Sequence, residues 1–387
     1  MNMKRQNMQR GGFLFINITV FLLLVLPTHA DEMNTIKSVL QSAKKVAISI
    51  DTFPDEFVIS VSPVRQTLQI IHSSARLAGA LISEVQNENY RKDLQAVVGD
   101  LNGTQKFRDT LLETLKTKLS AALVEVPPLG STAKYNTDRE AQQDRMNQLN
   151  SKGIDVLLDI KITAGIYGPE GEMFFRTNGK LYDVKSSKTL WRDEFVVTPT
   201  IEFKANQSFN TYFNPFKSNM FSPRLTMSKN ALTRWTENNG ENFKKAEDFG
   251  IQLSVAQLCG ALQLDVSEDY YFSCGISKLY ARKAKQAISF FEKAWNMNKQ
   301  KPERGNALVV ALYKAKKIEE AIKQGEIVIQ SPEGQNYPTV YYNLAYILVD
   351  KKKNPEKAKE YYQRYLELSG IPDTKLEKKL QQIQKKR

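Results

Sequence analysis

The chain has 387 residues, of which 41% are hydrophobic, and its formal net charge is +13. This length suits two domains of ordinary size with buried cores. Two cysteines and two histidines are too few for a metal centre, and no Gly-rich loop ends in the Lys-Ser/Thr pair of a nucleotide site. We therefore expect neither a metal nor a cofactor.

The N-terminus predicts export. Lys4, Arg5 and Arg10 precede the apolar run FLFINITVFLLLVLP, and the following small-residue sequence ends at Ala30. We expect residues 1–30 to be a signal peptide cleaved after Ala30, which leaves a soluble chain of net charge +10 in an exported compartment, most simply a bacterial periplasm. The alternative is an uncleaved anchor. No cysteine follows the run, so lipid attachment is not expected, and export disfavours a nucleic-acid partner.

Residues 31–265 show alternating strand and helix patterns, which indicates an α/β domain. The expected strands are 44–50, 57–62, 123–127, 154–168, 173–184 and 189–197. The expected helices are 65–85, 106–123, 138–149 and one or two within 225–262.

Three local patterns add detail to this domain. Apolar residues recur at intervals of four along helix 106–123, which places Phe107, Leu111, Leu115, Leu119 and Leu123 on one face. Strand 154–168 is apolar on both faces, as expected at the centre of a sheet. The short polar turn KSSK joins the last two strands into a hairpin.

The element order resembles the small α/β domain of curli-secretion-type and peptidoglycan-synthase-activating envelope lipoproteins. The stretches behind the resemblance are FRDTLLETLKTKL, GIDVLLDIKI and GKLYDVKSSKTLWRDE, with Asp183 and Trp191 in the last of them. The resemblance covers residues 44–263 and implies a mixed sheet flanked by helices. This chain lacks the lipid-attachment cysteine of that group, so outer-membrane tethering is in doubt.

The C-terminal third, residues 266–387, contains a repeat. Ala287 and Ala321 stand 34 residues apart in similar stretches, and a third stretch begins near Ala358. This period predicts stacked helix pairs. The order small, small, aromatic, small at Gly275, Ala287, Phe291 and Ala294 resembles the tetratricopeptide repeat. The resemblance spans residues 268–387 and implies an all-α domain that binds protein, closed by a polar capping helix in DTKLEKKLQQIQKKR.

Two units depart from the repeat pattern. The second has Val309 where a small residue is expected and Gly325 where an aromatic is expected, which we interpret as a large-for-small exchange within one unit. The third needs one extra residue in its turn DKKKNPEK. Its matching residues are Tyr341, Leu344, Ala345, Ala358 and Tyr362.

Cys259 and Cys274 flank the junction between the two domains. In an exported protein such a pair can form a disulfide, which would contribute on the order of 3 kcal/mol by restricting the unfolded chain. The alternative is two free thiols buried in apolar helices.

Two groups of residues are candidates for partner binding. The first lies on the expected first helices of the repeats: Asn306, Lys314, Tyr342 and Asn343. The second lies in the aromatic stretch 206–221 and includes Tyr212, Phe213 and Phe216. Exposed aromatic residues often mark a contact with a partner or membrane. The alternative is a loop that folds back over the sheet.

These observations favour a non-catalytic scaffold that binds a protein or peptide partner in the cell envelope. The alternative is binding to an anionic envelope polymer or membrane surface, because residues 351–387 hold twelve Lys or Arg against five Asp or Glu. A hydrolase is remote. His72 lies in an expected apolar helix, and acidic residues such as Asp51, Glu56 and Glu194 beside strand ends are common. We expect no catalytic residues.

Overall fold

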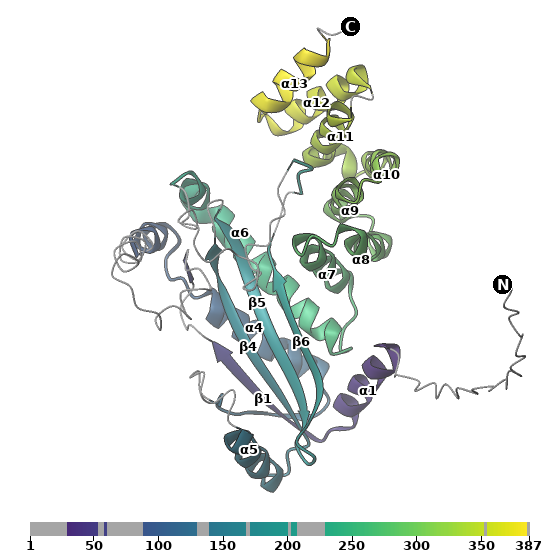
Figure 1. Ribbon diagram of the computed structural model, residues 1–387. Coiled ribbons are helices and arrows are strands. Elements are labelled where there is room, and N and C mark those ends of the chain that lie inside the picture. Colours follow the sequence, from purple (N-terminus) through teal and green to yellow (C-terminus); the bar gives the residue numbers. More distant parts are fainter. Residues whose placement is uncertain are drawn as a thin grey trace, which may run out of the picture.

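The computed structural model describes residues 29–52, 58–59, 88–129, 139–167, 171–199, 203–206, 229–351 and 354–384 (Figure 1). Residues 1–28 of the predicted signal peptide, the expected helix 65–85 with His72, and Glu56, Tyr212, Phe213 and Phe216 lie outside the described residues, whereas the last two residues of that peptide begin the helix His29–Ser42. In the described part of the chain, no helix is long and apolar enough to cross a bilayer.

A mixed sheet forms the centre of the N-terminal part. Its strands are β1 (Lys45–Thr52), β2 (Val58–Ile59), β3 (Ala122–Glu125), β4 (Val156–Tyr167), β5 (Glu172–Asp183) and β6 (Lys188–Val197). The order is β3-β1-β4-β5-β6, with β2 also paired to β4. β1 runs parallel to β3 and β4, and β4, β5 and β6 are antiparallel to one another. The central position of β4 and the β5–β6 hairpin are confirmed.

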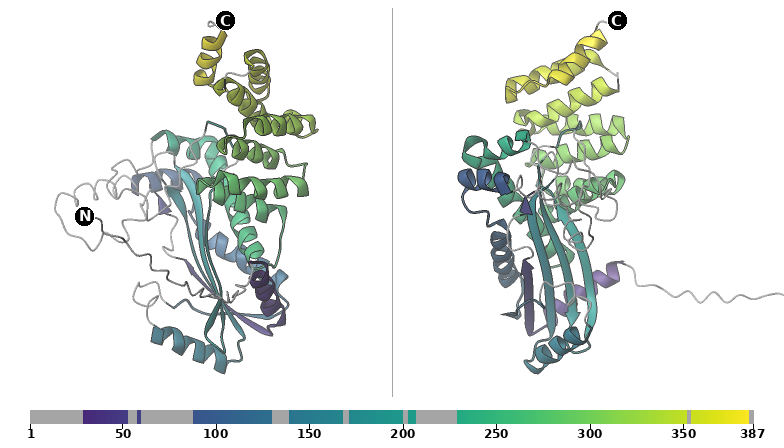
Figure 2. Two further views of the ribbon diagram at one scale, coloured as in Figure 1. Left: turned by 45° about the vertical axis from the view of Figure 1, so that its right-hand side comes forward. Right: turned by 60° about the vertical axis from the view of Figure 1, so that its left-hand side comes forward.

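Helices flank this sheet. Around it lie α1 (His29–Ser42), a helix over residues 88–98, α4 (Gly103–Lys118), α5 (Arg139–Ser151) and α6 (Lys229–Ala261). Successive side chains along β1 and β4 point to opposite faces of the sheet. Ile48 and Leu158 belong to the core cluster that includes α4 and α6, whereas Ala47 and Leu157 belong to the cluster that includes α5. The alternation divides the hydrophobic residues into two clusters. Figures 1 and 2 show α4 and α6 lying against the sheet and α5 near its lower end.

The predicted apolar face of α4 is largely confirmed. Phe107, Leu111 and Leu115 are fully buried, and Leu119, which follows the helix, is 8% exposed. Leu123 lies instead on β3, because the helix ends at Lys118. α6 contains a kink where Asn238, Asn239 and Gly240 have positive φ values. This kink explains why the sequence suggested either one or two closing helices.

The C-terminal part is a stack of helix pairs, so the predicted fold class is confirmed. The pairs are α7 (Glu268–Tyr280) with α8 (Ala284–Met297), α9 (Pro302–Lys314) with α10 (Ile318–Gln330), and α11 (Pro338–Asp350) with α12 (Pro355–Ser369). The terminal helix α13 (Thr374–Gln384) packs on α11 and α12. Figure 1 shows the stack rising away from the sheet.

Close packing explains the small residues of the repeat. A Cβ at Gly275 would come within 2.5 Å of the Phe291 ring, so α7 and α8 meet where glycine leaves room. Four residues connect α11 to α12, whereas three residues connect the helices of each of the other two pairs. This confirms the extra residue predicted in the turn of the third unit. A Cβ at Gly325 would come closest to Leu344 of the next pair. The exchange between Val309 and Gly325 within one unit stays a prediction.

The sheet part and the repeats share one continuous hydrophobic core. The contact runs through α6 and α7, where the Ser273 hydroxyl donates to Gln257 Oε1 at 2.6 Å and the Ser277 hydroxyl donates to the Val196 carbonyl of β6 at 2.9 Å. Cys259 and Cys274 lie at the same junction, and both are free buried thiols, the second of the two predicted arrangements.

Candidate functional site on the inner face of the helical repeats

Residues 203–206 lie against the first helices of the repeats. Phe203 is fully buried, Ala205 is 1% exposed, and their contacts come from α7, α8, α9 and α11. In Figure 1 this short segment stands beside α9 and α11, above the end of β6. We call the side of α7, α9 and α11 that meets it the inner face. The repeats therefore already hold one short segment of their own chain.

Two buried amides hold the main chain of this segment. Asn343 Nδ2 donates to the Phe203 carbonyl at 2.6 Å, and Asn306 Nδ2 donates to the same carbonyl at 3.0 Å. The Ala205 N–H donates to Asn343 Oδ1 at 2.7 Å. Both asparagines are fully buried, and burial without partners would cost each amide on the order of 1–3 kcal/mol. We call this pair the asparagine clamp.

The side chains of the held segment are recognised separately from its main chain. The Phe203 ring packs edgewise against Phe272 and Phe291, with ring centroids 5.8 and 6.0 Å away. Lys204 Nζ lies 5.5 Å from the centroid of the Tyr342 ring. Ala205 is 1% exposed. The inner face thus receives an aromatic, a basic and a small residue in succession.

A buried arginine closes the end of the inner face nearest the sheet. Arg304 is 1% exposed, and its guanidinium lies 3.7 Å from the centroid of the Phe272 ring. Its Nη2 donates to Asp269 at 2.5 Å, and Lys301 pairs with the adjacent Glu268. This charge is compensated within the protein, so we assign it to the packing of α7 against α9.

Beyond Tyr342 the inner face becomes a surface of tyrosine rings and lysines. Tyr342 stacks on Tyr346 with centroids 6.3 Å apart, and Tyr346 meets Tyr313 edgewise at 6.2 Å. Lysine Nζ atoms lie 5.0 to 5.8 Å from these centroids, namely Lys379 over Tyr346 and Lys351 and Lys314 over Tyr313. These three tyrosines and three lysines form what we call the tyrosine–lysine face.

Two aspartates orient the rings of this face. The Tyr342 hydroxyl donates to Asp373 at 2.7 Å, and the Tyr313 hydroxyl donates to Asp350 at 2.9 Å. Burial raises the pKa of both tyrosines, and the bonded aspartates raise it further. Burial also lowers the pKa of Lys314, because its charge is partly removed from water. The hydroxyls are neutral donors, and the ring faces contact one another and the lysines.

The structure corrects part of the predicted anchor set. Asn306 and Asn343 lie on first helices as expected, but they are buried and bind the chain's own main chain, so they are not exposed anchors for a partner. Tyr342 is 1% exposed, while Lys314 is half-buried on the tyrosine–lysine face. Sequence reasoning missed Phe203 and Lys204, because nothing in that stretch shows that it returns to the repeats.

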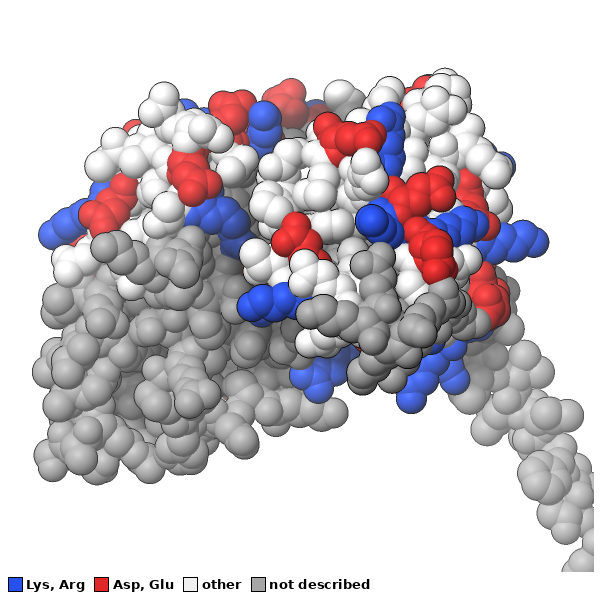
Figure 3. All heavy atoms as spheres, turned by 90° about the horizontal axis from the view of Figure 1, so that it is seen from above, with Lys and Arg blue, Asp and Glu red and all other residues white. Residues whose placement is uncertain are grey.

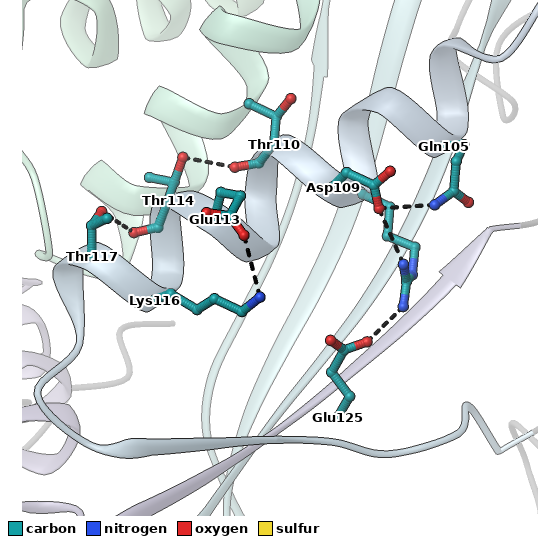
Figure 4. Close-up of polar contacts among 9 residues, drawn as sticks. Gln105, Asp109, Thr110, Glu113, Thr114, Lys116, Thr117 and Glu125 are labelled. Atoms are coloured by element: carbon teal, nitrogen blue, oxygen red, sulfur yellow. Dashed lines mark hydrogen bonds and ion pairs between the residues drawn. The ribbon is translucent and has the colours of Figure 1, made fainter.

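The sheet part of the molecule carries a pocket. A pocket of about 340 Å³ lies between β1, α4 and residues 125–128. At its rim Arg108 bonds Glu125 at 2.6 Å and Asp109 at 3.2 Å, and the other polar contacts in Figure 4 run along α4 itself. These ion pairs are exposed, and exposed pairs contribute little free energy.

Two of the carboxylates considered for a hydrolase, Asp51 and Glu194, form ion pairs within the sheet. Asp51 lies 3.6 Å from Lys161 on the neighbouring strand, and Glu194 forms an ion pair with Arg176 across the β5–β6 hairpin.

Comparisons with known proteins add little. No protein-family model matches the chain, no curated protein matches it, and the resemblance to envelope lipoproteins over residues 44–263 finds no support. Among solved structures it is similar to one titled "Crystal structure of YrrB: a TPR protein with an unusual peptide-binding site". The match has 17% identity and a TM-score of 0.28, over 40% of this chain and 74% of that one. The helix pairs described above rest on this chain's own contacts.

Proposed function

We propose that the protein is a non-catalytic scaffold of the cell envelope that binds a segment of a protein partner on the inner face of its helical repeats. The observation that supports this is the asparagine clamp, which holds Phe203 and Ala205 through main-chain hydrogen bonds. A surface that recognises main chain can recognise segments of differing sequence.

The clamp itself is used internally. Phe203 is fully buried, and burying a phenylalanine contributes about 1.5–3 kcal/mol, so an outside segment does not displace it readily. The partner instead occupies the part of the inner face that follows, where Tyr313 and Tyr346 are half-buried and Lys351 and Lys379 are exposed.

The distribution of charge favours a protein partner over an anionic polymer. Seen from above in Figure 3, basic and acidic side chains of the described residues alternate over the repeats. Lys357 pairs with Glu326, and Arg364 lies 3.1 Å from Glu367. A long polyanion needs a broad field of one sign, and much of the basic excess is neutralised locally.

Capture from the native envelope tests the proposal with two matched variants of the full chain. Tyr346 lies under Lys379 at 5.0 Å, and Tyr271, elsewhere on α7, lies under Lys293 at the same distance. Both tyrosines are half-buried. We expect Tyr346→Ala to lose a protein that wild type and Tyr271→Ala both retain. Equal capture by all three proteins would refute a partner site on the inner face.

A further inference from the structure

The tyrosine–lysine face carries an excess of positive charge. Asp350 is its central carboxylate, and Lys351 Nζ lies 2.6 Å from it. Lys379 also lowers the pKa of Asp350, and Asp350 in turn acts on Lys314, so three lysines gather around one aspartate.

A second, smaller group adjoins the first. The Lys204 charge acts on Asp373, which holds the Tyr342 hydroxyl. Counting both groups, and Glu377, which shares the Tyr362 hydroxyl with the main chain of Asp373, four lysines face three carboxylates. This side of the repeats is therefore net positive, although the wider surface is mixed.

The tyrosine rings lie beside these lysines. The hydroxyls of Tyr313 and Tyr342 are bonded to Asp350 and Asp373, which holds these two rings in place, and Tyr346 packs against both of them. Tyr313 and Tyr346 are half-buried between the lysines. An extended chain places successive side chains about 3.3 Å apart on alternate sides. Carboxylates can then meet the lysines while apolar or aromatic side chains lie on the rings of Tyr313 and Tyr346.

We propose that the tyrosine–lysine face binds an acidic, extended protein segment in which carboxylates alternate with apolar or aromatic residues. This inference rests on the proposed function and names the chemistry of the partner. Two features support it: the positive excess, and the continuity with a segment already bound, because Lys204 of that segment lies on Tyr342. A basic segment would meet four lysines, and an unbroken polyanion would meet Asp350 and Asp373.

Fluorescence anisotropy with the full chain and defined peptides tests this inference. The probe is a labelled peptide of about ten residues that alternates Glu with Val and Tyr, and its counterpart has Lys in place of Glu. Anionic lipid vesicles form a third arm. Lys351→Glu with Lys379→Glu reverses charge on the face, whereas Lys285→Glu with Lys323→Glu makes the same net change on α8 and α10. All four lysines are exposed, so each double variant is expected to fold.

We expect the acidic peptide to bind wild type at least about tenfold more tightly than the lysine peptide, and to weaken as salt rises. The variant on the face should lose about tenfold in affinity, and the control variant less than about twofold. The inference is overturned if the two peptides bind equally, if both double variants bind like wild type, or if only the vesicles bind. If the peptide experiment fails but wild type still captures a protein that Tyr346→Ala loses, the scaffold proposal holds and only the acidic ligand is excluded.

Discussion

Asn343 Nδ2 lies 2.7 Å from Asn306 Oδ1, and the two amides converge on the single carbonyl of Phe203. The contact joins neighbouring helix pairs to a segment more than a hundred residues earlier in the chain. Its members are fully buried. It is a structural element of the fold as well as the edge of the candidate binding face.

Removing one amide should destabilise the whole chain. In Asn343→Ala the Ala205 N–H loses its acceptor and the Phe203 carbonyl loses one of its two donors. We expect the free energy of unfolding to fall by about 2–4 kcal/mol, as for a buried polar network left incomplete. Urea unfolding followed by circular dichroism measures it. Asn150→Ala, at an exposed position, should change the value by less than about 0.5 kcal/mol. Equal stability of both variants would contradict the clamp.

The contact between Gly275 and Phe291 should show the cost of an added methyl group. Gly275→Ala places a Cβ about 2.5 Å from the Phe291 ring, and we expect a loss of about 1–3 kcal/mol. Adding Phe291→Leu to this variant removes the clash and should cost less than the two single changes summed. Thermal unfolding of the four proteins gives the coupling. Additive effects would mean that the two helices do not meet there.

The two thiols predict a loss of stability in alkaline solution. Burial raises the pKa of Cys259 and of Cys274 from 9.0 to about 12. The thiols ionise at a lower pH in the unfolded chain than in the folded one. Their contribution to the free energy of unfolding is therefore complete below pH 9 and declines as the pH rises toward about 12. Each thiol adds a slope of about 1.4 kcal/mol per pH unit. Cys259→Ala should remove one thiol's part of the slope in urea titrations from pH 8 to 11. An unchanged slope would show that Cys259 is not the titrating group.

The thiols also give a chemical prediction. Because both are buried and protonated near neutral pH, a thiol reagent should modify neither in the native protein and both after unfolding. Mass spectra before and after reduction should be identical in mass for protein purified from the envelope. A gain of two hydrogens on reduction would show that the pair is bridged there.

Export is tested by the N-terminus of the protein from cells. Sequencing of the purified protein should begin at Asp31, and fractionation should place it with the periplasm. An intact N-terminus with membrane association would favour the uncleaved anchor instead.

Much of the fold follows from residue patterns. The four-residue spacing of Phe107, Leu111 and Leu115 predicts the buried face of α4, because helix periodicity is local. The apolar run 154–168 predicts the centre of the sheet, and the position of Gly275 relative to Phe291 predicts a close helix pair. Each of these depends on residues near one another in the chain.

The binding face could be predicted only in part. Lys314 and Tyr342 follow from their places on first helices. The burial of Asn306 and Asn343 does not, because it depends on a segment that returns from residue 203, and the sequence between offers no sign of that return. The role of Lys379 was missed because its partner Tyr346 lies 33 residues earlier. Whether a helical asparagine or lysine faces water or another segment is decided by tertiary contacts.

The place of Phe203 between Phe272 and Phe291 has a practical consequence for dissecting the molecule. A fragment starting at residue 266 would lack Phe203, so Phe272, Phe291 and the two clamp asparagines would lose the group that covers them. The fragment would expose an apolar and hydrogen-bonding surface that is covered in the intact chain. Proteins retained by such a fragment would report on that artificial opening, and only ligands that also bind the whole chain would be physiological.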